Sequence, residues 1–448
     1  MKHKPYPKYK PSGIDWIGDI PEGWGSFQLR RCVQQINNGT TATQLDYVTE
    51  FPVTRIETIS SGSINFEKVG YIEEADVKKK DILSNGDILL SHINSLVYVG
   101  NCAIYNDHRT LVHGMNLLRL ILPKCISSEF LIYYLKGSVF KNQIQSIAKH
   151  AINQVSLPIS ALKSLLIAIP NKKEEQEKIA NFLDQKTAQI DDLIQKKEEM
   201  VKLLKEKRAA VINQAVTKGL DPNAKMKPSG IDWIGDIPGG WDVRRLKFIA
   251  STKFSNVDKH AKEEEQPVSL CNYVDVYYND FIDSNMDFMQ ATATNDEIRK
   301  FALNKGDVIV TKDSESWDDI AIPAYVKEDM HGVLCGYHLA IIQANQNICG
   351  EYIFWSFLSQ IINYQFQVSA TGVTRYGLGK GALDNAMFFA PSKKEQHKIA
   401  NYLYQKTTEI DGLIQKIESA IDKLREYRSS LITAAVTGKI DVRGAVKC

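Results

Sequence analysis

The chain has 448 residues, of which 44% are hydrophobic and 24% charged, and its formal net charge is +2. This length predicts several domains, and the composition excludes a disordered or collagen-like protein. No run of about 18 apolar residues is present, and no apolar signal segment follows the basic N-terminus. Seven scattered cysteines, never spaced as Cys-x-x-Cys, lead us to expect a cytoplasmic protein without a disulfide framework or a zinc site.

The charge is distributed unevenly along the chain. Residues 1–170 carry a net +4, residues 171–222 a net +1, residues 223–391 a net −7 and residues 392–448 a net +4. The overall charge therefore does not by itself suggest nucleic-acid binding.

An internal repeat divides the sequence into two halves. The segment KPSGIDWIGDIP stands at residues 10–21 and again, unchanged, at residues 227–238. Each copy contains one tryptophan, Trp16 or Trp233, and is followed by a second, Trp24 or Trp241. We expect Trp16 and Trp233 to be buried between a lobe and a helix. The repeat indicates a tandem duplication.

The segments after the two copies, 25–168 and 242–389, barely resemble each other. Short apolar runs at 87–91, 96–99, 117–122, 307–311 and 339–342 are typical of strands. Aromatic stretches at 130–140 and 352–366 predict helices. Each half therefore contains a mixed α/β lobe, and the two lobes have diverged.

Each lobe is followed by a long predicted helix. Residues 179–217 and 399–437 are identical at roughly half of their positions. Asn171 and Ser392 are each followed three positions later by a glutamate, which is a capping-box pattern. Gly219 and Gly438 stand where a helix end is expected. Apolar residues form one stripe on each helix: Ile179, Leu183, Ile190, Ile194, Val201, Leu204 and Val211, and Ile399, Leu403, Ile410, Ile414, Ile421, Leu424 and Leu431.

Two helices of about 45 residues, each about 65–70 Å long, would leave both stripes exposed if they stayed apart. We therefore predict two mixed α/β lobes separated by an antiparallel coiled coil, in a pseudo-twofold duplication. The predicted divisions are lobe 1 at 1–170, helical segment 1 at 171–222, lobe 2 at 223–391 and helical segment 2 at 392–448.

The sequence lacks the motifs of the enzyme classes that we considered. There is no Walker phosphate loop, no GxGxxG, no GxSxG, no HExxH and no Asn/Asp-Pro-Pro-aromatic motif of adenine methyltransferases. The nine histidines are isolated, and we interpret His113 and His338 as structural. We therefore expect a non-catalytic protein that binds no metal.

Polar loops in both lobes carry side chains that suit DNA. Arginine can bind guanine bidentately, asparagine and glutamine can pair with adenine, and hydroxyls and lysine suit phosphates. A flexible surface loop is the alternative interpretation, notably for the glycine-rich segment 369–380. The candidate DNA contacts are Lys149, Asn153, Gln154, His92, Asn94, Lys312, Trp317, Thr371, Thr374, Arg375, Tyr376 and Lys380.

With these features the sequence resembles the specificity (S) subunits of type I restriction–modification systems. The resemblance rests on SGIDWIGDIPxGW at the start of each half, and on KKEEQEKIANFLDQKTAQID and KKEQHKIANYLYQKTTEID in the helices. It implies two target-recognition domains, each reading one half of a bipartite, asymmetric DNA site. It also implies helices that set the spacing and dock two methyltransferase subunits for adenine N6, with restriction subunits joining the complex. S-adenosylmethionine, Mg²⁺ and ATP would then be bound by those partner subunits.

For the helices we expect a partner-docking face that includes Ile190, Ile194, Ile410 and Ile414. The net −7 of lobe 2 disfavours DNA binding, unless its basic residues gather on one face and partner subunits supply most phosphate contacts. Two other classes remain open: a coiled-coil adaptor whose lobes bind proteins, and an enzyme with an unrecognised site.

Overall fold

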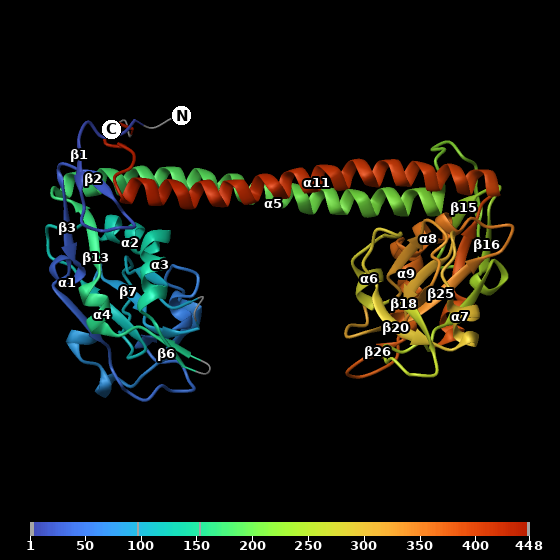
Figure 1. Ribbon diagram of the computed structural model, residues 1–448, viewed down its shortest axis with the longest axis horizontal. Coiled ribbons are helices and arrows are strands. Elements are labelled where there is room, and N and C mark those ends of the chain that lie inside the picture. The colour runs from blue at the N-terminus through green and yellow to red at the C-terminus, as the bar shows by residue number, and fades with distance from the viewer. Residues whose placement is uncertain (1–3, 96–97, 152–153, 446–448) are drawn as a thin grey trace. The chain divides into compact units, whose positions relative to one another are not determined.

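The computed structural model describes residues 4–95, 98–151 and 154–445 (Figure 1). The chain folds into two compact units. Unit 1 comprises Met1–Lys197 and Ser419–Cys448, and unit 2 comprises Glu198–Glu418. Each unit therefore contains one lobe together with part of each long helix. The division of the sequence at residues 170, 222 and 391 stays a prediction, because each compact unit combines a lobe with helical segments.

The lobe of unit 1 is built on a four-stranded antiparallel sheet of order β4-β10-β7-β9. Smaller sheets pair β1 with β2, β3 with β13, β5 with β6, and β8 with β12 and β11. The strands are β1 Tyr9–Pro11, β2 Asp19–Pro21, β3 Trp24–Gln28, β4 Gln35–Asn38, β5 Pro52–Thr54, β6 Val69–Tyr71, β7 Ile88–Ser91, β8 Ile93–Asn94, β9 Cys102–Ile104, β10 Leu117–Ile121, β11 Lys149–Ala151, β12 Gln154–Ser156 and β13 Leu166–Pro170. Its helices are α1 Leu29–Cys32, α2 Ser128–Lys136, α3 Ser138–Ile147 and α4 Ile159–Ser164.

The lobe of unit 2 is built on a five-stranded sheet of order β17-β25-β21-β23-β19, in which only β19 and β23 are parallel. Smaller sheets join β14 with β15, β16 with β27, β22 with β26, and β18 with β20 and β24. The strands are β14 Met226–Pro228, β15 Asp236–Pro238, β16 Asp242–Arg245, β17 Ala250–Phe254, β18 Gln266–Cys271, β19 Phe281–Ile282, β20 Met289–Ala293, β21 Val308–Thr311, β22 Asp313–Ser314, β23 Pro323–Val326, β24 Val333–Cys335, β25 Leu339–Ala344, β26 Tyr376–Gly377 and β27 Met387–Ala390. Its helices are α6 Tyr273–Tyr277, α7 Asn295–Phe301, α8 Gly350–Phe357, α9 Gln360–Ser369 and α10 Lys380–Asn385.

The two lobes share their strand order despite their dissimilar sequences. The order β4-β10-β7-β9 in unit 1 corresponds to β17-β25-β21-β23 in unit 2. A buried aspartate precedes each central strand, and its carboxylate accepts a hydrogen bond from a backbone N–H three residues earlier: Asp87 from Ser84 at 2.7 Å and Asp307 from Asn304 at 3.0 Å. The predicted mixed α/β lobes and the duplication are confirmed at the level of topology.

The two long helices are α5 Lys173–Lys218 and α11 Lys393–Val436. Both are followed by a glycine with positive φ, Gly219 at 74° and Gly438 at 71°, so the predicted helix ends are confirmed. No described helix is both long enough and apolar enough to cross a membrane.

The helices pair through an apolar seam and a repeated ion pair in each unit. In unit 1, the guanidinium of Arg428 on α11 donates to Asp191 on α5 at 2.8 and 3.1 Å. In unit 2, Nε of Arg208 on α5 lies 3.1 Å from Asp411 on α11. Unit 1 therefore pairs the first part of α5 with the last part of α11, and unit 2 pairs the remaining parts. This pairing is antiparallel, as predicted.

A buried glutamine joins each helix to its lobe. In unit 1, the side chain of Gln176 accepts from the N–H of Ser127 at 2.8 Å and donates to the carbonyl of Pro170 at 2.9 Å. In unit 2, Gln396 accepts from the N–H of Cys349 at 2.7 Å and donates to the carbonyl of Pro391 at 2.8 Å. Each glutamine side chain thus provides a hydrogen-bond partner for a backbone N–H at the start of a lobe helix and for a backbone carbonyl at the end of a strand.

The two predicted lobe helices and one predicted strand are corrected. The stretch 130–140 divides into α2 and α3 at Gly137, and the stretch 352–366 divides into α8 and α9 at Ser359. Residues 96–97 of the strand expected at 96–99 lie outside the described residues. Residues 98–100 form a turn, in which the N–H groups of Tyr98 and Val99 both donate to the carbonyl of Ser95.

The prediction that Trp16 and Trp233 are buried is wrong. Trp16 is 57% exposed and Trp233 49% exposed. Each lies in a turn between two isoleucines, which are buried in the first copy and half-buried in the second. The second tryptophan of each repeat is buried instead: Trp24 packs edge-on against Phe130, and Trp241 packs edge-on against Phe389.

Gln176→Leu is expected to lower the free energy of unfolding of the chain by about 1–3 kcal/mol, because two buried backbone groups lose their partner. Urea unfolding measures the change. Gln195→Leu, an exposed position on the same helix, is the matched control and should change stability by less than about 0.5 kcal/mol. Equal effects of the two substitutions would contradict the role of Gln176.

Candidate DNA interface

The predicted DNA contacts of lobe 1 gather on the three-stranded sheet β11-β12-β8. Strand β8 follows the central strand β7 directly, and it pairs with β12 through Asn94 opposite Val155. Strand β11 begins at the exposed Lys149, and its end pairs with Gln154. Segments that are about 55 residues apart in the sequence thus meet at one edge of the lobe. Asn153 lies outside the described residues.

His92 and Asn94 occupy different environments on this sheet. The imidazole of His92 is only 7% exposed, and burial lowers its pKa. Its Nε2 lies 3.4 Å from the amide nitrogen of Asn38, whereas its buried Nδ1 has no partner among the described residues. Asn94 is half-buried and accepts a hydrogen bond from the N–H of Ser95 at 2.8 Å. As placed, Asn94 and Lys149 can reach a ligand more directly than His92.

The predicted contacts of lobe 2 gather at an equivalent place. Strand β22 follows the central strand β21, and it pairs with β26 through Asp313 opposite Gly377 and Ser314 opposite Tyr376. The N–H of Leu378 also donates to the carbonyl of Lys312 at 2.8 Å. Both lobes therefore bring a short strand after the central strand beside a segment that precedes the long helix.

The segment 371–377 is a closed hairpin rather than a loose loop. The backbones of Thr371 and Gly377 exchange two hydrogen bonds, of 2.9 and 3.1 Å. Gly372 has φ +147°, and a Cβ there would lie 2.0 Å from the carbonyl oxygen of Arg375. The hairpin exposes Thr371, Thr374 and Arg375, while Lys380 is exposed at the start of α10. The glycine-rich composition thus encodes one backbone conformation.

Arg375 lies beside a histidine and an aspartate. Nδ1 of His338 is 2.7 Å from the carboxylate of Asp313 and 3.3 Å from Nη2 of Arg375. A carboxylate can only accept, so Nδ1 carries the proton and cannot accept from Arg375. The guanidinium donors therefore remain available for a ligand. His338, which the sequence suggested to be structural, belongs to this surface.

Lys312 and Trp317 differ in their access to solvent. The ammonium of Lys312 donates to the carbonyl of Ser255 at 3.2 Å and lies 4.6 Å above the ring of Tyr337. Lys312 is therefore half-buried and occupied by these contacts, whereas Trp317 is 49% exposed.

Sequence reasoning missed a group of tyrosines beside this hairpin. On α6, Tyr273 stacks on Tyr277 with ring centroids 5.4 Å apart, and Tyr278 packs edge-on at 5.0 Å. The hydroxyl of Tyr277 donates to Asp319 at 2.6 Å, which raises the pKa of Tyr277 to about 12. The run Tyr273-Val-Asp-Val-Tyr-Tyr278 was the available signal, since aromatic rings can stack on bases. Of the three tyrosines Tyr278 is exposed, whereas Tyr273 and Tyr277 are half-buried.

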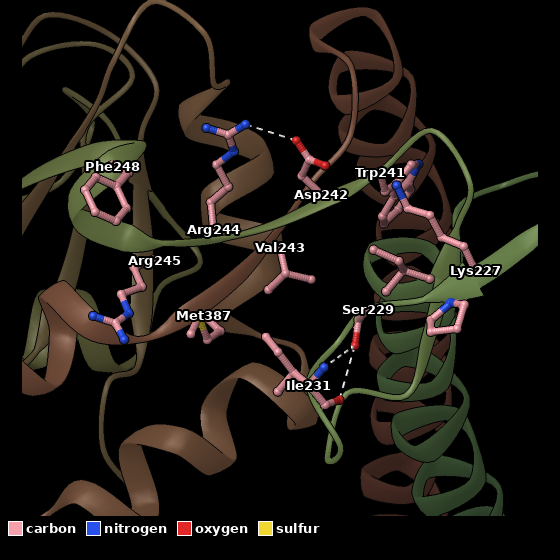
Figure 2. Close-up of a pocket in the computed structure, with 12 residues that line it drawn as sticks. Lys227, Ser229, Ile231, Trp241, Asp242, Val243, Arg244, Arg245, Phe248 and Met387 are labelled. Atoms are coloured by element: carbon pink, nitrogen blue, oxygen red, sulfur yellow. Dashed lines mark hydrogen bonds and ion pairs between the residues drawn. The ribbon is translucent and has the colours of Figure 1, made fainter.

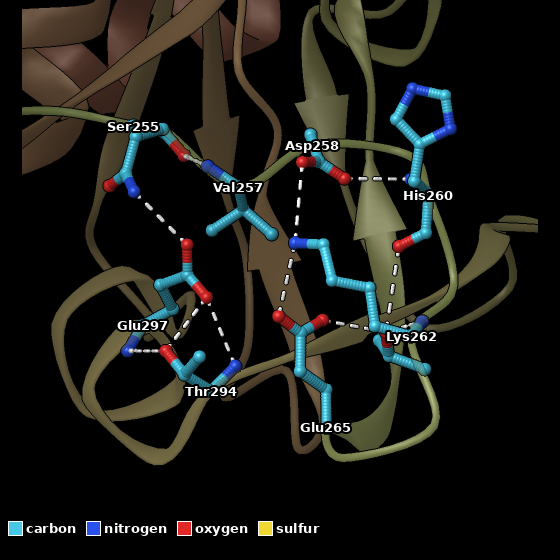
Figure 3. Close-up of polar contacts among 10 residues, drawn as sticks. Ser255, Val257, Asp258, His260, Lys262, Glu265, Thr294 and Glu297 are labelled. Atoms are coloured by element: carbon cyan, nitrogen blue, oxygen red, sulfur yellow. Dashed lines mark hydrogen bonds and ion pairs between the residues drawn. The ribbon is translucent and has the colours of Figure 1, made fainter.

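Charged residues at another edge of lobe 2 are paired with one another. Figure 3 shows Lys262 between Asp258, at 3.5 Å, and Glu265, at 3.1 Å. The hydroxyl of Thr292 and the ammonium of Lys262 lower the pKa of Glu265, and the hydrogen bond with Glu265 raises the pKa of Lys262. Lys262 therefore neutralises acidic neighbours away from the hairpin 371–377, which itself contains no aspartate or glutamate.

The residues predicted to bind a partner lie inside the helix pair. Ile410 and Ile414 share one apolar cluster with Val201, and Ile190 belongs to the core of unit 1, with the half-buried Ile194 packed against it. The outward-facing apolar residues of the helices include Leu193 and Leu413, which occupy equivalent positions of the duplication. Among the described residues, no group of three or more metal-ligating side chains is present.

Comparisons with known proteins agree with this architecture. A family model described as a type I restriction modification DNA specificity domain matches residues 21–203. A putative type I restriction enzyme MjaX specificity subunit of Methanocaldococcus jannaschii is 30% identical over 442 residues, which cover 95% of this chain and 96% of that protein. The type I restriction enzyme EcoKI specificity subunit of Escherichia coli is 22% identical, with 94% and 90% covered.

Solved structures show the same fold. A chain from a study titled "Structural basis underlying complex assembly and conformational transition of the type I R-M system" matches with a TM-score of 0.72 at 13% identity, over 93% of this chain and 98% of that one. The HsdS subunit from Thermoanaerobacter tengcongensis matches with a TM-score of 0.53 at 14% identity, over 94% and 98%.

This protein belongs to the specificity subunits of type I restriction–modification systems. Members of this family are the non-catalytic DNA-recognition components of their complexes.

Gly372→Ala is expected to weaken DNA binding by the assembled complex about tenfold or more, because a Cβ at this position would clash with the carbonyl oxygen of Arg375 and force the hairpin into another conformation. An electrophoretic mobility titration with the target DNA measures the loss. Gly379→Ala is the matched control, since a Cβ there meets no atom within 4 Å. Unchanged binding by Gly372→Ala would show that the hairpin conformation does not matter.

Proposed function

We propose that each lobe reads one half of an asymmetric, bipartite DNA site through its short-strand edge. This proposal rests on one observation: the two lobes present chemically different side chains at the same place in their fold, beside the short strand that follows the central strand. Lobe 1 presents Lys149 and Asn94 on β11 and β8, whereas lobe 2 presents Arg375 and Thr374 beside β22. Equivalent positions with unlike side chains fit two unlike half-sites.

The paired helices hold a recognition lobe at each unit and dock two methyltransferase subunits, one for each half-site. Two equivalent exposed leucines, Leu193 and Leu413, fit a partner that binds twice. The methyltransferase supplies S-adenosylmethionine chemistry at adenine N6, and restriction subunits with Mg²⁺ and ATP complete the assembly. Partner subunits also contribute phosphate contacts, which offsets the acidic surplus of lobe 2.

An adaptor whose lobes bind proteins is the second candidate. Such lobes would present contiguous apolar patches, but the exposed side chains at the two short-strand edges include Lys149 in lobe 1 and Thr371, Thr374 and Arg375 in lobe 2, where Val373 is also exposed. We therefore favour DNA.

Mapping of methylated bases tests the proposed function. The chain is co-expressed with its methyltransferase subunit in a host without adenine methylation, and the genome is sequenced with detection of modified bases. We expect one asymmetric, two-part motif with N6-methyladenine in each half. A stable complex that adds no methylated motif would favour the adaptor.

Arg375→Ala is expected to relax one position in one half of that motif, with a cost of about 1–3 kcal/mol in binding, if the guanidinium reads a base. The same sequencing identifies the relaxed position. Arg299→Ala serves as the control, because Arg299 is exposed and pairs with Asp296 in another part of lobe 2. A uniform loss of methylation over all positions would instead make Arg375 a phosphate contact.

A further inference from the structure

The repeated segment KPSGIDWIGDIP forms the same turn in both units. In the first copy the N–H of Ile14 donates to the hydroxyl of Ser12 at 3.0 Å, and Gly18 has φ +67°. The side chain of Ile20 is buried. The second copy has the same bond between Ile231 and Ser229, as Figure 2 shows. The fold therefore requires the serine, glycine and isoleucine positions of the repeat.

Three other positions of the repeat are not required by the fold. The side chains of Asp15, Trp16 and Asp19 are exposed, and the same holds for the second copy. No hydrogen bond or ion pair joins these carboxylates to any residue in the described part of the chain. We call these positions the Asp-Trp turns, which comprise Asp15, Trp16 and Asp19 in unit 1 and Asp232, Trp233 and Asp236 in unit 2.

The stability of the fold does not explain why the two Asp-Trp turns have the same sequence. The long helices belong to the same duplication, yet about half of their positions differ, and the lobes differ almost throughout. Substitutions at exposed positions usually change stability by less than about 0.5 kcal/mol. Stability alone therefore does not explain why both turns keep the same exposed indole and carboxylates. Binding of the same partner at both turns would explain why these exposed side chains are the same.

We propose that each Asp-Trp turn docks one copy of the methyltransferase subunit, in a pocket of that subunit that combines apolar and cationic side chains. This inference rests on the proposed function, which calls for two copies of one partner. Exposed tryptophans are frequent hot spots of protein interfaces. An arginine or lysine of the partner can lie over the indole face and pair with the adjacent carboxylates.

The surroundings of the two turns differ. Ile14 and Ile17 are buried in unit 1, whereas the equivalent Ile231 and Ile234 are only half-buried. Figure 2 shows that Ile231 faces Val243 and Met387, with which it lines an open cavity of about 630 Å³. The second turn thus adjoins more accessible apolar surface, so the two docking sites must be measured separately.

The test measures how many methyltransferase copies each variant binds. Full-length chains carrying Trp16→Ala, Trp233→Ala or both are purified and titrated with the methyltransferase subunit, and the complexes are counted by native mass spectrometry. Each single variant is expected to weaken one binding step at least about tenfold, so that a complex with one copy accumulates. The double variant is expected to weaken both steps. Asp15→Asn combined with Asp232→Asn should weaken binding most at low salt.

Tyr364→Ala is the matched control, because Tyr364 is a large exposed aromatic residue on α9, outside both turns. Thermal unfolding of each variant should match the wild type, since the replaced side chains are exposed. If the double variant still bound two methyltransferase copies with wild-type affinity, the docking proposal would be overturned. The same conclusion would hold if the double variant failed to bind a restriction subunit instead. Failure of the wild-type chain to bind any methyltransferase would overturn the proposed function itself.

Discussion

The hydrogen bonds of one buried glutamine in each unit fix how a recognition lobe meets the long helices. Gln176 and Gln396 each accept a hydrogen bond from the N-cap N–H of a lobe helix and donate one to a proline carbonyl at or directly after the end of a strand. Because both contacts are buried, a lobe that turned away from its helix would leave these backbone groups without partners. The remaining architecture follows from this constraint. A lobe can change almost all of its sequence and still be held in the same way by the segment KEEQEK or KKEQHK.

The duplication therefore separates two kinds of requirement within one chain. The helices repeat an ion pair at equivalent positions, Asp191 with Arg428 and Asp411 with Arg208, and this repetition stabilises the antiparallel pairing in each unit. The lobes repeat only their strand order and the edge at which polar residues gather. Under the proposed function, specificity would change at that edge through hairpin residues such as Arg375, without altering the packing of the lobe against its helices. Such a division suits a DNA specificity subunit.

Much of this fold could be predicted from the sequence, because the helix stripe, the capping residues and the terminal glycines are local signals. The polar loops chosen from the sequence lie together in the candidate interface, although pairing of β8 with β12 joins residues far apart in sequence, which no local pattern encodes. Exposure was harder to predict: Trp16 is exposed and Ile190 is buried, because the direction of a side chain depends on tertiary packing. The surroundings of His338 could not be predicted either, since its neighbours Asp313 and Arg375 come from other strands and loops.

The central claim is that each lobe reads its own half-site, and a cycle of protein and DNA substitutions tests it directly. The complex of the chain with its methyltransferase is titrated with four DNAs, with neither, one or both halves of the site altered, for both wild type and Arg375→Ala. We expect the loss caused by Arg375→Ala to disappear when one particular half is altered and to persist when the other is altered. A loss that persists on all four DNAs, or that depends equally on both halves, would contradict the assignment of one lobe to one half-site.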